Sequence, residues 1–143
     1  MKYAIVTGAY GYIGSVLCKV LREQDYYVVG VDNDPNASKD WMHTNSRIKY
    51  CNEFVDQCFT SEMVAHVLND YPDATIFHLA ANSLLGPSAY DPLSYYTNNT
   101  ANTLQLLTKI KPSNKFIFAS TAAVYGITEK VVTENSKIDP PNN

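Results

Sequence analysis

The 143-residue chain has no apolar run long enough to cross a membrane, no cluster of basic residues and no internal repeat. The first absence argues against a membrane-spanning helix, which needs about 20 consecutive apolar residues. Lys and Arg number 11 against 14 Asp and Glu, and the resulting net charge of −3 disfavours a nucleic-acid surface. We therefore expect a globular protein that binds neither membrane nor nucleic acid.

Cysteine and histidine are sparse as well. Cys18, Cys51 and Cys58 are odd in number and lack the Cys-x-x-Cys spacing of a metal site, and the histidines are scattered. The N-terminus enters an apolar, strand-like segment at once, which leaves no room for a signal peptide. These features predict reduced thiols, no metal site and a cytoplasmic location.

The most informative stretch is residues 2–32. The apolar run KYAIV is typical of a buried strand, and the glycine turn TGAYGYIG follows it. Apolar residues then recur at helical spacing, and a second apolar run ends on Asp32. Strand, glycine turn, helix, strand and acid is the order of a dinucleotide-binding unit.

Each part of this unit has a physical role. Glycines let the backbone approach a pyrophosphate with no Cβ in the way, and the helix that follows points free N–H groups at the anion. The Asp32 carboxylate can accept hydrogen bonds from the adenosine ribose, which favours NAD over NADP. Lys39 and Arg47 are the nearest basic candidates for a 2′-phosphate, and neither directly follows the strand.

The spacing Gly-x-x-Gly-x-x-Gly, opened by Thr7-Gly8 and followed by VDN at 31–33, resembles the extended short-chain dehydrogenase/reductases. Within them it looks most like the NAD-dependent sugar-nucleotide epimerases and dehydratases, of the UDP-glucose 4-epimerase kind. HLAA at 78–81, DPLSYYTNNTANT at 91–103 and STAAVYG at 120–126 extend the likeness over nearly the whole chain. It implies NAD as cofactor, a nucleotide sugar as substrate, and hydride transfer to and from a sugar carbon.

The resemblance also implies site residues. Thr121 matches the family's catalytic Ser or Thr, whose hydroxyl can hydrogen-bond the oxygen that gains or loses a proton. The expected cofactor contacts follow the strand ends and the helix after the fourth strand: Gly8, Tyr10, Gly11, Tyr12, Ile13, Gly14, Asp32, Asn33, Asp56, Gln57, Leu79, Ala80, Ala81, Ser83, Asn99 and Ser120.

Some assignments stay open. Gln57 holds the position of the family's adenine-contacting acid when residues are counted back from the next strand, with Asp56 one residue earlier, whereas a gapped reading selects Glu53. Asn33 suits a turn nearly as well as a cofactor contact. His78 could serve as a base, but its place inside a strand favours a packed, hydrogen-bonded histidine.

One part of the family pattern is missing. The family's chemistry uses a Tyr-x-x-x-Lys pair, and none of the 11 tyrosines here has lysine four residues later. In the family this pair would lie just past Asn143. We therefore expect the N-terminal part of a longer enzyme or a truncated relative, with a non-catalytic NAD-binding module as the alternative.

Strand-like segments at 2–6, 26–31, 48–55, 74–79 and 115–119 alternate with helical ones. They predict an α/β, Rossmann-like three-layer fold with a parallel sheet in the order 3-2-1-4-5, incomplete at its C-terminal side. Helices are expected after an N-cap at Thr60 and from Asp91 to about Ile110.

The same pattern gives the domain organisation. Residues 1–126 would form the NAD-binding domain, and 127–143 a polar loop toward the absent substrate-binding part. Without that part, apolar surface near Phe116 and Phe118 should remain exposed and favour homo-oligomers.

Overall fold

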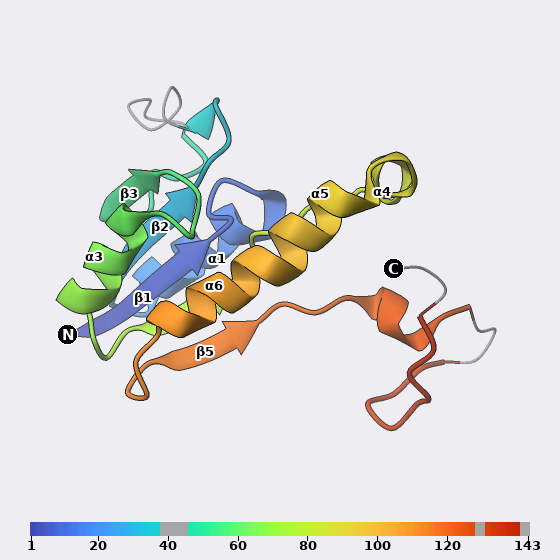
Figure 1. Ribbon diagram of the computed structural model, residues 1–143. Coiled ribbons are helices and arrows are strands. Elements are labelled where there is room, and N and C mark those ends of the chain that lie inside the picture. Colours follow the sequence, from blue (N-terminus) through green and yellow to red (C-terminus); the bar gives the residue numbers. More distant parts are fainter. Residues whose placement is uncertain (38–45, 128–130, 141–143) are drawn as a thin grey trace.

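The computed structural model describes residues 1–37, 46–127 and 131–140. Five parallel strands form one sheet in the order β3-β2-β1-β4-β5 (Figure 1). The predicted three-layer fold and strand order are confirmed. The strands are β1 (Lys2–Thr7), β2 (Tyr26–Asp32), β3 (Glu53–Asp56), β4 (Thr75–His78) and β5 (Lys115–Phe118).

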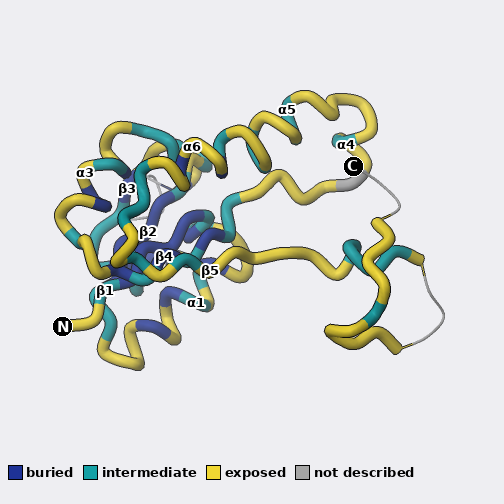
Figure 2. Tube along the Cα trace, turned by 60° about the horizontal axis from the view of Figure 1, so that its bottom comes forward, coloured by how far each residue is buried: buried dark blue, intermediate teal, exposed yellow. Residues whose placement is uncertain are grey.

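Helices cover both faces of this sheet. Helix α1 (Tyr12–Glu23) packs on one face, where Val6 and Val28 belong to the same core cluster as Cys18 of the helix. The helices α3 (Glu62–Asp70) and α6 (Asn102–Lys109) cover the other face, where the core includes Ile5 and Leu106. Figure 2 shows the buried residues concentrated in the strands and in the sides of these helices that face them.

The segment between β4 and α6 departs from the predicted single helix. Two short helices, α4 (Leu85–Tyr90) and α5 (Pro92–Tyr96), lead into a π-helical turn, η1 (Thr97–Ala101), and then α6. The predicted start is right, since Asp91 Oδ1 accepts a hydrogen bond from Ser94 N–H. Residues 85–109 thus form an arm that lies on the sheet at α6 and projects beyond it at α5 and α4 (Figure 1).

Two local predictions need correction, and the structure also defines the buried face of α1. The strand expected at 48–55 is limited to β3, because residues 47–50 form a turn closed by a hydrogen bond from Cys51 N–H to the Ile48 carbonyl. The cap of α3 is Ser61 rather than Thr60, since Ser61 Oγ accepts from Val64 N–H. In α1 the buried face is formed by Gly14, Cys18 and Leu21, while Val16 and Val20 are exposed.

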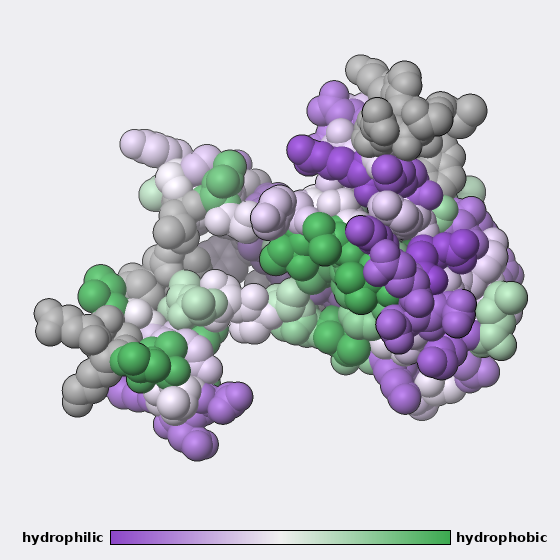
Figure 3. All heavy atoms as spheres, turned by 180° about the vertical axis from the view of Figure 1, so that it is seen from behind, coloured by the Kyte–Doolittle hydropathy of each residue, from purple (hydrophilic) through white to green (hydrophobic). Residues whose placement is uncertain are grey.

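The β5 edge of the sheet is poorly covered. Phe118 is 55% exposed and Ile117 49% exposed, while Phe116 is half-buried. From behind, hydrophobic side chains gather over α1 and beside β5 (Figure 3). Residues after β5 extend away from the sheet and form one 3₁₀ turn, η2 (Ala122–Tyr125).

Within the described ranges, no helix is long and apolar enough to span a membrane.

Candidate functional site

A cavity of about 810 Å³ opens at the carboxyl ends of β1, β2, β4 and β5, a size typical of a ligand pocket. It collects the predicted site residues from the glycine turn, the strand ends and the arm. Those lining it are Gly8, Tyr10, Gly11, Tyr12, Ile13, Gly14, Asp32, Asn33, Leu79, Ala80, Ala81, Ser83, Asn99, Ser120 and Thr121.

Two predicted contacts lie elsewhere. Asp56 and Gln57 are exposed at and just after the end of β3, and neither belongs to the lining of the cavity. Of the alternatives for the adenine-contacting acid, Glu53 is also outside, because its carboxylate accepts hydrogen bonds from Tyr27 and Tyr71, each at 2.6 Å. These hydrogen bonds also raise the pKa of both tyrosines.

Two positions of the glycine turn lie too close to neighbouring backbone to carry a side chain. Gly8 has φ +74°, and a Cβ there would lie 2.8 Å from the Ala80 backbone nitrogen. A Cβ on Gly14 would lie 2.0 Å from the Gly8 carbonyl oxygen. Because neither neighbour is a movable side chain, both positions require glycine, and the backbone of the turn stays open toward the cavity.

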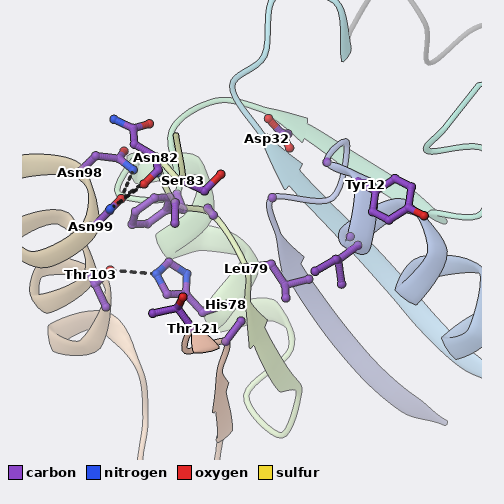
Figure 4. Close-up of a pocket in the computed structure, with 18 of the residues that line it drawn as sticks. Tyr12, Asp32, His78, Leu79, Asn82, Ser83, Asn98, Asn99, Thr103 and Thr121 are labelled. Carbon is purple, nitrogen blue, oxygen red and sulfur yellow. Dashed lines mark hydrogen bonds between the residues drawn. The ribbon is translucent and has the colours of Figure 1, made fainter. Parts of the chain in front are cut away.

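Asp32 is held in position by the backbone. Its Oδ2 accepts a hydrogen bond from Tyr10 N–H at 2.9 Å, and its Oδ1 accepts one from Asp34 N–H at 3.0 Å. A carboxylate has roughly four acceptor positions, so two bonds fix its orientation and leave acceptor capacity toward the cavity. Figure 4 shows Asp32 beside the glycine turn, away from the polar residues of the arm.

His78 joins the sheet to the arm. Its Nδ1 lies 2.7 Å from Thr7 Oγ1 and its Nε2 lies 2.9 Å from Thr103 Oγ1 (Figure 4). Thr7 Oγ1 also accepts a hydrogen bond from Ala80 N–H at 3.3 Å. Burial lowers the pKa of His78 to about 4, so the ring is neutral near pH 7 and bridges the two hydroxyls. The packed, hydrogen-bonded histidine is the alternative that the structure supports.

Asn99 lies in the π-helical turn, and its amide group pairs with the loop after β4. Asn99 Oδ1 accepts from Asn82 N–H at 2.8 Å, and Asn99 Nδ2 donates to the Asn82 carbonyl at 2.9 Å. Asn98 Nδ2 also donates to Asn99 Oδ1, at 3.0 Å. Two of the bonds hold the same loop residue, so Asn99 fixes the wall of the cavity between Ala81 and Ser83.

Thr121 stands at the mouth of the cavity, where β5 has ended. It caps η2, with its Oγ1 accepting a hydrogen bond from Ala123 N–H at 3.2 Å. That bond uses an oxygen lone pair, so the hydroxyl hydrogen keeps its capacity to donate. Tyr125, at the end of η2, is outside the lining of the cavity.

Several lining residues had no clear sequence signal. Asn82 lines the cavity from the loop after β4, Tyr95 from α5 and Asn98 from the π-helical turn, and none of the three was expected at the site. Arg47 lines the cavity from the turn before β3, although it does not directly follow β2. The burial of Ser46 and Ile48 could not be read from the sequence pattern.

The cavity has the features that NAD requires. A turn with glycine at its closest approaches, at a helix N-terminus, suits the pyrophosphate, and an oriented acid at the end of β2 suits the adenosine ribose. The small residues Ala80 and Ala81 keep the middle open. The fold and cavity together define a Rossmann-type dinucleotide-binding protein.

Comparison with known proteins narrows this class. Residues 4–143 match the NAD dependent epimerase/dehydratase family, and the chain belongs to that family. It is 32% identical over 141 residues to a UDP-glucose 4-epimerase of Rhizobium leguminosarum bv. trifolii, covering 97% of this chain and 41% of that protein. A UDP-glucose 4-epimerase of Klebsiella pneumoniae is 31% identical over 131 residues, covering 89% of this chain and 94% of that sequence.

Solved structures of epimerases share the fold of this chain. The UDP-Glc/GlcNAc 4-epimerase of Campylobacter jejuni superposes with a TM-score of 0.84 at 32% identity, over 99% of this chain and 44% of that one. The UDP-glucose 4-epimerase of Brucella ovis, solved in complex with NAD, gives 0.84 at 27% identity, over 99% and 43%. NAD is therefore the family's cofactor. Apart from the short Klebsiella sequence, these relatives are more than twice as long as the chain. No comparison supports a non-catalytic module.

The contact of Gly14 with Gly8 yields a first prediction. Gly14→Ala should weaken NAD binding more than tenfold, because a Cβ cannot lie 2.0 Å from a carbonyl oxygen and the turn must open. Gly86→Ala is the matched control, since a Cβ at Gly86 meets nothing within 4 Å. Isothermal titration calorimetry measures both, and equal affinity of the Gly14 variant and the unmutated chain would contradict the account.

Burial of His78 yields a second prediction. The pKa of His78 is about 4 in the folded chain against an ordinary value of 6.5, so below pH 6.5 the unfolded chain takes up a proton first. The free energy of unfolding should therefore fall by on the order of 3 kcal/mol as pH drops from about 6.5 to about 4.

Urea unfolding at each pH tests this difference. His78→Gln should lose that part of the pH dependence, while His66→Gln should keep it, because His66 is exposed on α3. The same pH profile for the His78 variant and the unmutated chain would show that His78 is not held neutral.

Proposed function

We propose that the chain is the cofactor-binding part of a nucleotide-sugar epimerase or dehydratase that acts by hydride transfer. The observation that carries the proposal is the meeting of the glycine turn, Asp32 and Thr121 around one cavity. NAD, when bound, supplies the hydride acceptor and donor. Similar epimerases were solved with UDP-sugars, one with a formylated UDP-arabinopyranose and one with UDP-glucose, which supports a nucleotide sugar as substrate.

The residues at the two ends of the cavity would have different tasks. Asp32 would accept hydrogen bonds from the adenosine ribose, since its two carboxylate oxygens are already oriented by backbone N–H groups. The turn from Gly8 to Gly14 would receive the pyrophosphate. Ala80, Ala81 and Ser83 would line the nicotinamide end, with Asn99 holding the loop that carries them.

Thr121 would act at the reacting carbon. Its hydroxyl can donate to a substrate oxygen while its own oxygen remains bonded to Ala123 N–H, which keeps it oriented. A hydroxyl in this role stabilises charge on the oxygen and does not by itself remove a proton at neutral pH. Residues 1–126 would thus serve cofactor binding, and 127–143 would lead toward the substrate.

A third prediction concerns turnover. The chain lacks Tyr-x-x-x-Lys, and loss of a positioned general acid/base costs on the order of 10²–10⁴-fold in rate. The 143-residue chain should therefore bind NAD and turn over no UDP-sugar. A longer chain that includes the pair should epimerise or dehydrate a UDP-sugar, and Thr121→Ala in it should be strongly impaired. Turnover by the 143-residue chain would direct attention to His78 or Tyr125 instead.

A fourth prediction concerns association. Exposed Ile117 and Phe118 on β5 support homo-oligomers, as sheet faces of this kind are normally covered. The Ile117→Lys variant should shift the chain toward monomer, whereas Ile127→Lys, in the extended segment, should not. Light scattering after gel filtration measures the molar mass of each variant, and a monomeric unmutated chain at high concentration would refute the prediction.

We also propose a cytoplasmic location. The three cysteines are free thiols, which suits a reducing cytoplasm.

A further inference from the structure

Arg47 brings a positive charge to one end of the cavity. The cavity is also lined there by the acids Asp32 and Asp34, and His78 at the other end is neutral near pH 7. Among the described residues that line the cavity, Arg47 is the only Lys or Arg. A guanidinium in a cofactor pocket that is also lined by carboxylates can select among ligands that differ in charge.

The backbone of Arg47 is held firmly. Its neighbours Ser46 and Ile48 are buried, and Ser46 Oγ accepts a hydrogen bond from Ile48 N–H at 3.1 Å. The turn is closed by the hydrogen bond from Cys51 N–H to the Ile48 carbonyl at 2.9 Å. Arg47 therefore extends from an anchored turn and not from a free loop.

Tyr10 connects Arg47 to Asp32. The guanidinium carbon of Arg47 lies 5.3 Å from the centre of the Tyr10 ring, within the range of a cation–π contact. The backbone N–H of the same tyrosine holds Asp32 Oδ2. Arg47 thus contacts the residue whose backbone N–H holds Asp32, at the end of the cavity where the adenosine ribose would lie.

We infer that Arg47 is a specificity-determining residue that binds a phosphate on the 2′-hydroxyl of the adenosine ribose. The inference deepens the proposed function and rests on it. Asp32 repels this phosphate and favours NAD, whereas Arg47 attracts it, so the chain retains measurable affinity for NADP. The preference for NAD is the balance of the two side chains. A guanidinium suits the role because it presents several donors to phosphate oxygens at once.

The test compares ligands that differ by one phosphate. Calorimetry measures NAD and NADP, and also 5′-AMP and adenosine 2′,5′-bisphosphate, binding to the unmutated chain and to Arg47→Gln. A hydrogen bond to a charged group corresponds to about tenfold in affinity, so Arg47→Gln should weaken NADP and the bisphosphate about tenfold and leave NAD and 5′-AMP nearly unchanged. Asp32→Asn should have the opposite effect and raise the affinity for NADP relative to that for NAD.

Lys49→Gln is the matched control. Lys49 lies two residues along the same turn, also makes a cation–π contact at 5.3 Å, with Tyr50, and does not line the cavity. Lys49→Gln removes the same charge as Arg47→Gln. It should leave unchanged the ratio of NAD to NADP affinity and the ratio of 5′-AMP to adenosine 2′,5′-bisphosphate affinity. Arg47→Lys should restore part of the NADP affinity, and circular dichroism checks that each variant is folded.

The outcomes separate this inference from the proposed function. Equal weakening of NAD and NADP by Arg47→Gln would mean that Arg47 acts on a part common to both, and would overturn the inference while leaving the cofactor site intact. So would NADP binding that Arg47→Gln leaves unchanged, or an equal effect of Lys49→Gln. No binding of NAD by the folded, unmutated chain would overturn the cofactor site and the inference together.

Discussion

The backbone of the glycine turn after β1 touches the backbone at the end of β4, and the geometry of the cavity depends on this contact. A Cβ at Gly8 would lie 2.8 Å from the Ala80 nitrogen, so the two strand ends are as close as peptide backbones without side chains allow. The Thr7 hydroxyl reinforces the contact by accepting a hydrogen bond from Ala80 N–H. Both walls of the cavity's middle are therefore set by backbone atoms, which no rotamer change can move.

Polar contacts extend this arrangement in both directions. Toward the arm, Thr7 meets His78 and His78 meets Thr103, so the position of α6 is coupled to the turn through a neutral ring. Toward β2, Tyr10 N–H fixes the Asp32 carboxylate. Gly8 N–H also donates to the Val31 carbonyl at 2.8 Å, which ties the turn to β2. The backbone contact between Gly8 and Ala80 thus sets the distance between Asp32 at one end of the cavity and α6 at the other.

Much of this could be predicted from the sequence. The glycine turn, the alternation of strands and helices, and Asp32 are local patterns whose physical meaning does not depend on distant residues, and they led to the sheet order and to most of the cavity lining. The errors arose where tertiary contacts decided the outcome. β3 is shorter than the strand expected at 48–55, because residues 47–50 form a turn and Asn52 Oδ1, at 2.8 Å, accepts the Val28 N–H in place of a strand carbonyl. The π-helical turn with Asn99 and the entry of Arg47 into the cavity have no local signal.

The central claim is that the glycine turn, the end of β2 and the loop after β4 form one dinucleotide cradle. Titration of the isotope-labelled 143-residue chain with NAD, followed by amide NMR shifts, tests it most directly. The largest shifts should occur together and saturate with one affinity at 8–14, 32–34 and 80–83, while those of β3 and α3 should change little. Shifts confined to one of these segments, or centred on Asp56 and Gln57, would contradict it.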